Sequence, residues 1–423
     1  MEIMVPHPLV LPDEGLSLEA LETAVHAWGL EVQRRALAAA WARQAAVRPP
    51  APCPTCGGTV TTGAGYKARQ VETVFGPVRL QRGRRRCQAC GAHFQPDAAV
   101  LSQAVGAGQC TPALRALAAL CGASWPYQQA AQVVGRLRGA PLAAETVRAI
   151  VGHAGAAVAA QHQAEAATAC APPAAAPPPV VGPARLDVVV DGAWVRSHDN
   201  PEGMELKVGV AHTGSVACGR TRTRLAARRY AATAHGVGRF GPLVTAAITY
   251  LHGYDAADAT WLGDGAEWVW RLQAATLAAT PVLDRWHLRD ARRRALRAAV
   301  PEQERRAAWS RLLEAHLEVG AVAQAVAVLE ELAIQHPHAR LTEFAAYLRA
   351  QEARIPNYAA RRAAGQTIGS GVGEKAVDIV VNRRCKGKRG MKWWRARADG
   401  VVALRVAHLN GEWEPRLSRA LHA

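Results

Sequence analysis

Two pairs of cysteines near the N-terminus restrict the fold of this chain more than any other feature. Cys53 and Cys56 flank Pro-Thr, Cys87 and Cys90 flank Gln-Ala, and a glycine follows each pair. Glycine lets such C-x-x-C knuckles turn tightly, and four thiolates from two knuckles form the closed tetrahedral site that structural zinc prefers. We therefore predict one structural Zn²⁺ on these four cysteines. Two redox pairs or buried free thiols are the alternatives.

The segment between the two knuckles has the pattern of a zinc ribbon. Residues 71–81 alternate in polarity like a hairpin around Gly76-Pro77. A cationic strand next to the zinc suits contacts with phosphates, although a solvated face would have the same composition. The arginines that lead into the second knuckle are Arg82, Arg84, Arg85 and Arg86, and the last three are predicted DNA contacts.

The charge of the chain indicates a polyanionic partner. Lys and Arg number 51 against 34 Asp and Glu, which gives a net charge of +17 and a sequence pI near 10.1. Nucleic acid is the commonest partner of so basic a protein, while an acidic membrane surface or an ordinary basic enzyme are the alternatives. No secretory signal and no apolar run long enough for a membrane helix is recognisable, so we expect a cytoplasmic protein.

Helical patterns dominate the N-terminal part of the chain. Apolar residues recur at helical spacing over Leu18–Ala45, with Ser17 as N-cap. Residues 111–160 read as short helices broken at Gly122, Gly135 and residues 139–141.

Two of these short helices have the length of a helix-turn-helix. They cover Ser124–Val134 and Ala144–His153. The second, which carries Arg148, would be the recognition helix, and a purely structural helical pair is the alternative.

A proline-rich stretch predicts a domain boundary. Six prolines fall within residues 164–184, and such a stretch forms neither a helix nor a sheet ladder. Beyond this Ala/Pro linker the pattern changes to short strands, which we expect at residues 186–190, 205–211, 216–222, 259–262 and 281–283, with helices between and after them.

Acidic residues follow two of the predicted strands. Asp191 comes directly after residues 186–190, Asp264 follows residues 259–262, and Glu374 lies where a glycine-rich turn enters a helix. The order of elements, β-β-β-α-β-α-β-α, is that of an RNase H-like fold. Carboxylates at neighbouring strand ends converge, and three oxygen ligands together suit two Mg²⁺ or Mn²⁺ ions for phosphoryl transfer. Since Asp-Gly is also a common turn, chance placement is the alternative.

These blocks together resemble one group of enzymes. Besides the knuckles, they are Asp191-Gly-Ala-Trp, Leu262-Gly-Asp264-Gly-Ala-Glu-Trp-Val-Trp270, Asp284-Arg-Trp-His287 and Gly369-Ser-Gly-Val-Gly-Glu374. Their order resembles the DDE-type transposases of bacterial insertion sequences, most nearly the Kra-type branch, which is akin to the Mutator-like superfamily. The resemblance covers residues 53–409.

The resemblance implies a domain organisation and roles for the acids. It implies an RNase H-like catalytic domain with an all-helical insertion between the second and third acid. Asp191, Asp264 and Glu374 would be the metal ligands, and Asp284 and His287 would support the site. A multidomain α+β protein is therefore expected. Its parts are an N-terminal helical segment at 1–48, the zinc ribbon at 49–100, a helical DNA-binding region at 101–163, the linker at 164–184, the catalytic domain at 185–290 and 364–423, and the insertion at 291–363.

A basic run with interleaved tryptophans follows Glu374. Cations alternating with aromatic rings suit a phosphate backbone and splayed bases, and a solvated helix face with buried Trp is the alternative. The DNA contacts predicted here are Arg383, Arg384, Lys386, Lys388, Arg389, Lys392, Trp393 and Trp394. Arginines that would line the same channel are Arg285, Arg289, Arg292, Arg293, Arg294 and Arg297.

The sequence as a whole predicts a DNA transposase that cleaves element ends and joins them to target DNA. Its partners would be double-stranded DNA, at terminal repeats and at the target, and a second copy of the chain in a homodimer or larger assembly. We expect it in a bacterial cytoplasm, at the nucleoid and not at a membrane. A non-catalytic, zinc-dependent DNA-binding protein derived from a transposase is the main alternative, and a structure-selective nuclease is another.

Overall fold

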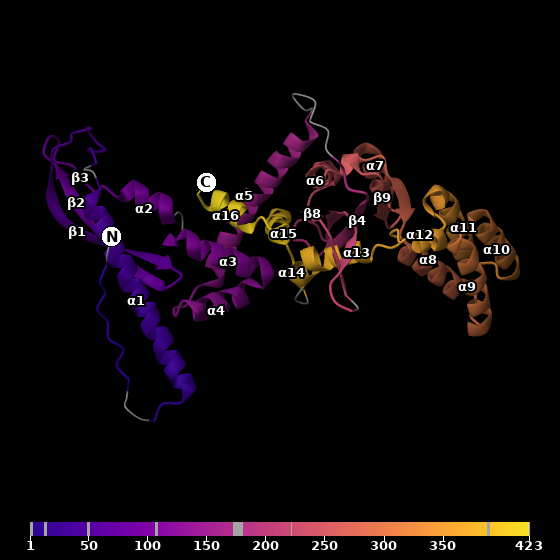
Figure 1. The fold of residues 1–423 in the computed structure, drawn as a ribbon, viewed down its shortest axis with the longest axis horizontal. Helices are drawn as coiled ribbons and strands as arrows, with labels where there is room; N and C mark the ends of the chain where they lie inside the picture. Colours follow the sequence, from indigo (N-terminus) through magenta and orange to yellow (C-terminus); the bar gives the residue numbers. More distant parts are fainter. Residues whose placement is uncertain are drawn as a thin grey trace. The chain divides into compact units, whose positions relative to one another are not determined.

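The fold combines helices and strands in two compact units. A computed structural model describes residues 3–11, 15–48, 51–105, 109–171, 181–220, 222–386 and 390–422. The first unit is Met1–Ala157 with Glu414–Ala423, and the second is Val158–Trp413. Both contain helices and strands, so the protein is a mixed α/β multidomain protein (Figure 1). Within the described residues, no helix has the length and apolar character needed to cross a bilayer.

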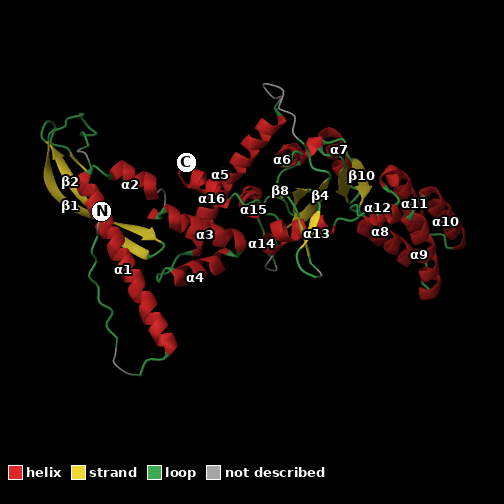
Figure 2. Ribbon diagram, viewed as in Figure 1, coloured by secondary structure: helices red, strands yellow, loops and turns green. Residues whose placement is uncertain are grey.

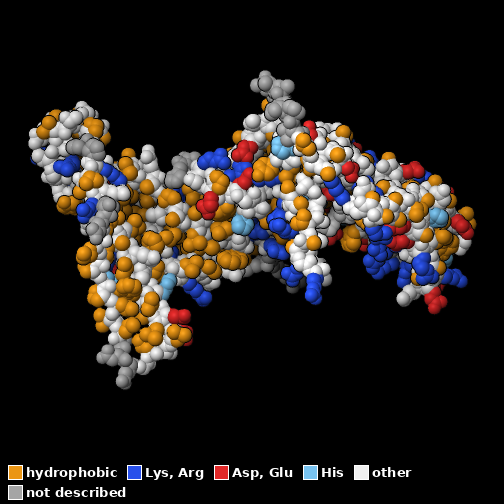
Figure 3. All heavy atoms as spheres, in the orientation of Figure 1, with side chains coloured by type: hydrophobic (Ala, Val, Ile, Leu, Met, Phe, Trp, Pro, Cys, Tyr) orange, Lys and Arg blue, Asp and Glu red, His pale blue; other side chains and the backbone are white. Residues whose placement is uncertain are grey.

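The first unit begins with the helix α1 (Leu18–Val47), which confirms the predicted N-terminal helix. The Ser17 hydroxyl accepts an amide hydrogen bond at 3.2 Å and caps its first turn. Trp41 in the C-terminal half packs against the core of the neighbouring sheet. The N-terminal half leaves Leu18 and Val25 exposed, and Figure 3 shows hydrophobic side chains along this helix.

A three-stranded antiparallel sheet carries the cysteine knuckles. Its strands are β1 (Thr61–Thr73), β2 (Gly76–Cys87) and β3 (His93–Phe94), in that order. Thr73 pairs with Gly76, so the turn lies at residues 74–75 and not at Gly76-Pro77 as predicted. The Thr73 hydroxyl donates to the Gly76 carbonyl at 2.7 Å and thereby closes the turn early. The buried residues of this small core are Val71, Val78, Leu80, Leu101 and Val105.

Four helices complete the first unit. They are α2 (Ala98–Val105), α3 (Pro112–Ser124), α4 (Tyr127–Leu137) and α5 (Ala144–Cys170), of which α5 continues into the second unit.

Two glycines that were expected to break this region lie inside helices instead. Gly122 belongs to α3, and a Cβ there would lie 2.5 Å from the Val151 side chain in α5. This glycine therefore permits close packing of the two helices. Gly135 lies inside α4, and only the segment around residues 139–141 separates two helices as predicted.

The predicted linker begins later than expected. Residues 164–170 continue α5, because this stretch contains no proline and is rich in alanine, the best helix former. Most of the prolines on which the linker prediction depends fall in residues 172–180, outside the described residues.

The second unit is built around a five-stranded mixed sheet of order β10-β9-β4-β5-β8 (Figure 2). β5 pairs antiparallel with β4 and with β8, whereas β9 runs parallel to β4 and β10 runs parallel to β9. Their bounds are β4 (Leu186–Val195), β5 (Met204–His212), β8 (Arg228–Thr233), β9 (Ala259–Gly263) and β10 (Thr280–Leu283).

The prediction of the third strand, at residues 216–222, is wrong. Residues 216–222 fall in a small hairpin of β6 (Ser215–Ala217) and β7 (Thr223–Leu225), which pair only with each other. The sheet uses β8 in that place. Its sequence, Arg-Arg-Tyr-Ala-Ala-Thr, has little strand propensity of its own, and pairing with β5 makes it a strand.

Helices cover both faces of the sheet. α6 (Val237–Tyr250) lies on the face of Gly209, whose absent Cβ would lie 3.1 Å from the Phe240 ring. α13 (Gly371–Val377) lies on the opposite face, where a Cβ at Gly373 would lie 2.7 Å from Val189. Every second residue of β4 from Val189 therefore faces α13.

The region from 286 to 363 is helical, as predicted. The Tyr358 hydroxyl of its last helix donates to the Leu283 carbonyl at 2.8 Å and joins this insertion to β10. Its helices are α8 (Arg285–Ala299), α9 (Gln303–Glu318), α10 (Val322–Gln335), α11 (Ala339–Gln351) and α12 (Tyr358–Ala363). Outside the insertion, α7 (Glu267–Thr276) follows β9. A π-helical turn (Asp378–Asn382) and α14 (Arg383–Cys385) follow α13. The last two helices are α15 (Arg395–Leu409), which packs on β8, and α16 (Trp413–His422).

Candidate functional site

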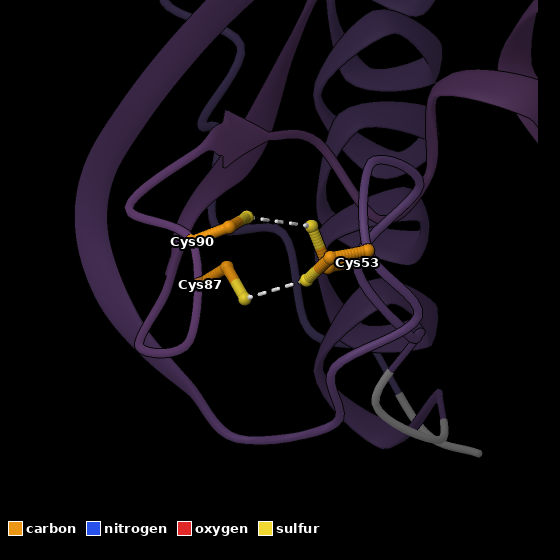
Figure 4. A group of neighbouring side chains, drawn as sticks. Cys53, Cys87 and Cys90 are labelled. Carbon is orange, nitrogen blue, oxygen red and sulfur yellow. Dashed lines mark hydrogen bonds between the residues drawn. The ribbon is translucent and has the colours of Figure 1, made fainter.

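The four cysteines of the two knuckles form one cluster in the first unit. Their sulfur atoms all lie within 4.8 Å of one another, close enough to bind a metal ion. Cys53 lies 3.7 Å from Cys90 and Cys56 lies 3.6 Å from Cys87, sulfur to sulfur. Figure 4 shows the sulfurs gathered around a common point. This arrangement is consistent with structural zinc, which prefers four thiolates in a closed tetrahedral site.

The backbone of the knuckles favours thiolates. Desolvation opposes ionisation of Cys53, but the amides of Cys56 and Thr55 outweigh it and lower the Cys53 pKa to about 6. The Cys90 amide likewise lowers the pKa of Cys87. These N–H groups stabilise the negative form of sulfur, which is the form that binds metals.

The crowding of the sulfurs acts in the opposite direction on Cys56. The Gly58 amide favours its thiolate, but hydrogen bonds with the sulfurs of Cys90 and Cys87 raise the Cys56 pKa to about 12. Four sulfurs this close cannot all ionise without a cation, so the cluster has the electrostatic character of a metal site.

A group of acidic residues lies at one edge of the sheet in the second unit. Val189 of β4 pairs with Leu262 of β9 in parallel register, so continuing both strands by two residues brings Asp191 opposite Asp264. Asp264 follows β9 directly, as predicted. Asp191 was predicted to follow its strand, but β4 continues through it to Val195, because the antiparallel ladder with β5 runs further than the parallel one.

Glu374 approaches the same edge from a helix. It lies in the first turn of α13, next to Gly373, which packs against Val189. Asp191 is two residues beyond Val189 and therefore shares the face that α13 covers. The fold thus brings the three predicted acids together from two strands and a distant helix.

The pKa of Asp191 is raised, mainly by burial and in smaller part by the neighbouring acids. Burial raises it to about 6, and the negative charges of Asp264 and Glu374 add to the increase, while the Gly192 amide and His287 act against it. The Gly192 amide donates to the Asp191 carboxylate at 2.7 Å. Asp191 is therefore a half-buried carboxylate, and the Gly192 amide and His287 do not fully offset the unfavourable effect of burial and of the neighbouring acids on its negative charge.

The three acids are more widely spaced than the sulfurs. Among the described residues, the four cysteines are the one group of three or more metal-capable side chains whose ligand atoms all lie within 4.8 Å of one another. The carboxylates nevertheless interact electrostatically, and within the described part of the chain no Lys or Arg forms an ion pair with them. Hard oxygen donors without a Lys or Arg partner suit Mg²⁺ or Mn²⁺.

Asp284 and His287 lie beside these acids. Asp284 is fully buried and caps α8, where its carboxylate accepts the His287 amide at 2.9 Å and lies 2.5 Å from the His287 Nδ1. The other carboxylate oxygen accepts the Ser370 amide at 2.6 Å. Because Ser370 precedes α13, Asp284 joins the start of α8 to the turn that leads to Glu374. Ser370, which no sequence pattern singles out, contributes its backbone: the amide binds Asp284, and the carbonyl accepts the Glu374 amide at 2.8 Å.

The charges of this pair are set by their mutual contact. The hydrogen bond with Asp284 raises the His287 pKa against the effect of burial, and the negative charges of Asp284, Asp264 and Asp191 raise it further. Burial opposes ionisation of Asp284, but hydrogen bonds from His287 and Ser370 lower its pKa. His287 thus keeps its proton to a higher pH than a free histidine, and it lies within the electrostatic field of the acids.

The raised pKa of Asp191 predicts a gain of stability on neutralisation. At pH 8 without divalent metal, Asp191→Asn should increase the free energy of unfolding by up to about 3 kcal/mol, since two pKa units correspond to roughly that amount. Between the ordinary value of 3.8 and about 6 the folded chain holds a proton that the unfolded chain has lost. Wild-type stability therefore falls as pH rises through this window, and the advantage of the variant disappears near pH 4.

Urea unfolding at pH 8 and pH 4.5, followed by tryptophan fluorescence, measures this effect. Glu267→Gln is the control, because the Glu267 side chain is exposed and pairs with Arg271. A variant at Asp191 that is less stable than wild type at pH 8 would contradict the electrostatic assignment.

The basic residues predicted to contact DNA differ in their exposure. Arg84, Arg85 and Arg86 are exposed on β2, whereas Arg82 is buried in an ion pair with Asp97 at 3.0 Å. Arg82 is therefore a structural residue of the ribbon and not part of a cationic surface, because the ribbon side that it faces is covered by the start of α2.

The basic run after Glu374 is partly buried. Arg384 is 1% exposed and its guanidinium lies over the Trp393 ring at 4.8 Å, while Trp393 itself is 5% exposed. Both were predicted to contact DNA, but in the folded chain neither side chain is at the surface. Trp394 remains 54% exposed and stacks on His198 at 5.0 Å.

The remaining basic residues of this run are at the surface. Lys386 and Lys392 are exposed, and Arg383 is exposed but forms an ion pair with Asp378 at 3.1 Å. Lys388 and Arg389 lie outside the described residues.

Two other basic groups are engaged in ion pairs. Arg148, near the start of α5, is exposed and pairs with Glu145 one turn away. In the insertion, the carboxylate of Glu314 binds Arg285 and the buried Arg292. Arg292 was expected to line a DNA channel and instead joins α8 to α9. Arg289, Arg293, Arg294 and Arg297 are exposed on α8.

Comparison of the sequence with protein-family models and with curated proteins found no match. The function is therefore inferred from the site itself.

Proposed function

We propose that this chain is a DNA transposase, which cleaves the ends of an element and joins them to target DNA by metal-dependent phosphoryl transfer. The proposal includes an RNase H-like catalytic domain in the second unit. The mixed sheet of order β10-β9-β4-β5-β8 supports it, because its strands occur along the chain in the order expected from the sequence. The position of the insertion, between Asp264 and Glu374, supports it as well.

One observation carries the proposal. Asp191, Asp264 and Glu374 come from three separate segments, which the parallel register of β4 with β9 and the packing of α13 on Val189 bring to one edge of the sheet. A fold gains no stability from gathering three carboxylates beside a single histidine and no Lys or Arg partner, because their like charges repel. Such a cluster is understandable when a cation or a phosphate with its counter-ions occupies the site.

The donor set fits Mg²⁺ or Mn²⁺. Two such ions held by Asp191, Asp264 and Glu374 would stabilise the attacking and leaving oxygens of an in-line phosphoryl displacement. The chain itself orients these acids: Asp191 is fixed by the Gly192 amide, and Asp264 accepts the Ala266 amide at 3.0 Å.

His287 contributes a positive charge. Its Nδ1 is bound to Asp284, which leaves Nε2 as the donor that can meet an anionic phosphate. The raised His287 pKa keeps the ring protonated to a higher pH than a free histidine. We propose for this residue the positioning of the scissile phosphate beside the acids.

The surface charge supports DNA as the partner. The net charge is +17, and exposed cations that can contact phosphates occur on the ribbon and after Glu374. Joining two element ends requires both to be present together, so the proposal includes a homodimer or larger assembly on DNA. The proposed contacts are Arg84, Arg85, Arg86, Arg148, Arg383, Lys386, Lys392 and Trp394.

End cleavage tests the proposal. The full chain, loaded with zinc, is incubated with labelled duplexes carrying the DNA that flanks its gene, with Mg²⁺, with Mn²⁺ or with EDTA added just before assay. Cuts at fixed positions that need divalent metal are expected. Tight binding of these ends without any cut would instead favour a domesticated, zinc-dependent DNA-binding protein. Cutting of branched DNA irrespective of end sequence would favour a structure-selective nuclease.

A further inference from the structure

The last helices of the insertion contact the two strands that lead into Asp264 and Asp284. Tyr358 of α12 is 1% exposed, and its hydroxyl binds the carbonyl of Leu283, the residue before Asp284. Arg361 of the same helix donates to the Thr260 hydroxyl at 2.9 Å. The insertion is thus anchored on β9 and β10, not merely attached through its ends.

α11 reaches the turn that follows Asp264. The side-chain amide of Gln351 donates to the Gly265 carbonyl at 3.1 Å, and Gln351 is 7% exposed. Gly265 has a φ of +99°, a conformation that side-chain-bearing residues rarely adopt. A turn of this kind has many alternative conformations in a free chain. A hydrogen bond from the buried Gln351 side chain to the Gly265 carbonyl therefore restricts the turn considerably.

Tyr347 lies over the same turn. A Cβ at Gly265 would be 2.9 Å from the Tyr347 hydroxyl oxygen, so the phenol occupies the space that a side chain would need. Burial raises the Tyr347 pKa to about 12, and the negative charges of Asp264 and Asp284 contribute to the increase. A neutral hydroxyl from the insertion therefore lies within the field of the acids.

We propose that Tyr347 and Gln351 are positioning residues of the acidic site, through which α11 holds the Asp264–Gly265 turn and sets the direction of the Asp264 carboxylate. Neither residue touches the reacting atoms in this assignment. Partners that orient metal ligands in this way typically contribute about 10–100-fold to metal affinity. The expected change in metal affinity rests on the proposed function, whereas the restriction of the Asp264–Gly265 turn by α11 does not.

The experiment compares two substitutions with matched controls. Gln351→Met keeps the length of the side chain and removes the donor to Gly265, and Tyr347→Phe removes only the hydroxyl. Gln324→Met, at an exposed position of α10, and Tyr250→Phe, at the exposed end of α6, are the controls. Mn²⁺ affinity of the zinc-loaded full chain is measured by calorimetry, and hydrogen–deuterium exchange is followed in the peptide spanning residues 262–268.

Gln351→Met is expected to weaken Mn²⁺ binding by about 10–100-fold and to accelerate exchange in this peptide, and Tyr347→Phe to do both to a smaller extent. The controls should match wild type. If exchange in the rest of the sheet is unchanged, general unfolding is excluded as the cause of the faster exchange in this peptide.

Either of two results overturns the inference: unchanged Mn²⁺ affinity and exchange in both variants, or absence of Mn²⁺ binding by wild type. The outcome is separable from that of the proposed function. Wild type that cuts DNA, with variants that bind Mn²⁺ equally well, would leave the transposase and remove the positioning role. If wild type never cuts DNA but the variants bind Mn²⁺ more weakly and exchange faster, the positioning role stands and the transposase function falls.

Discussion

Asp264→Asn is expected to reduce metal-dependent strand cleavage by roughly 10³-fold or more, since loss of metal-ion stabilisation removes several kcal/mol from the transition state. Asp264 follows β9 at the sheet edge, and its charge acts on both Asp191 and His287. Asp191→Asn and Glu374→Gln should have losses of similar size. In the proposed mechanism the three acids act as a unit, so combining two substitutions should add little.

Binding of the element ends separates a chemical defect from a folding defect. All three variants should bind labelled ends at least as tightly as wild type, because each removes a negative charge that repels phosphate. Glu267→Gln is the matched control, with an exposed carboxylate three residues after Asp264. Cleavage that survives in the Asp264 variant, at a rate near that of the control, would remove this site from the chemistry.

Loss of the zinc site is expected to unfold the ribbon of the first unit. Structural zinc contributes apparent binding energies of about 10–16 kcal/mol in small zinc domains, and that energy is available only to the folded form. The ribbon core is small and consists mainly of Val71, Val78 and Leu80, with Leu101 and Val105 from α2. Cys87→Ser should therefore abolish the cooperative unfolding of this region, which circular dichroism and proteolysis can follow.

Metal content and a control cysteine make this test specific. Elemental analysis of wild type should give one zinc per chain, and Cys87→Ser should give none. Cys218→Ser should retain both the zinc and the fold, since Cys218 is exposed, belongs to the second unit and is not a member of the cluster. A wild-type chain that folds without zinc, or a Cys87 variant that remains protected from protease, would contradict a structural metal at this site.

The features that were predictable from the sequence depend on short stretches of chain. The cysteine cluster follows from two knuckles, each of which is a four-residue turn with a glycine behind it. α1 follows from apolar spacing and a capping serine, and Asp264 follows from a short apolar strand. In each case neighbours within a few residues determine the local conformation, so pattern and propensity are sufficient.

The errors occur where residues distant in the chain decide the outcome. β8 is a strand because β5 offers it a ladder, and Gly122 stays helical because α5 packs against it. Arg384 looked like a DNA contact because its neighbours are basic, but the Trp393 ring nine residues later covers it. Charge patterns along a sequence do not distinguish an exposed cation from one that stacks inside the fold.

By itself, the sequence determined which four cysteines form the metal-compatible cluster, which acids are candidates for the second site and the helical nature of residues 286–363, since spacing and residue type specify these. Only the tertiary structure decided that the acids share one electrostatic site and that α11 reaches it. Gln351 and Gly265 are 86 residues apart, and no periodicity links them. Their contact depends on how the insertion packs on the sheet, and that packing reflects the shape of many buried side chains together, not any short pattern.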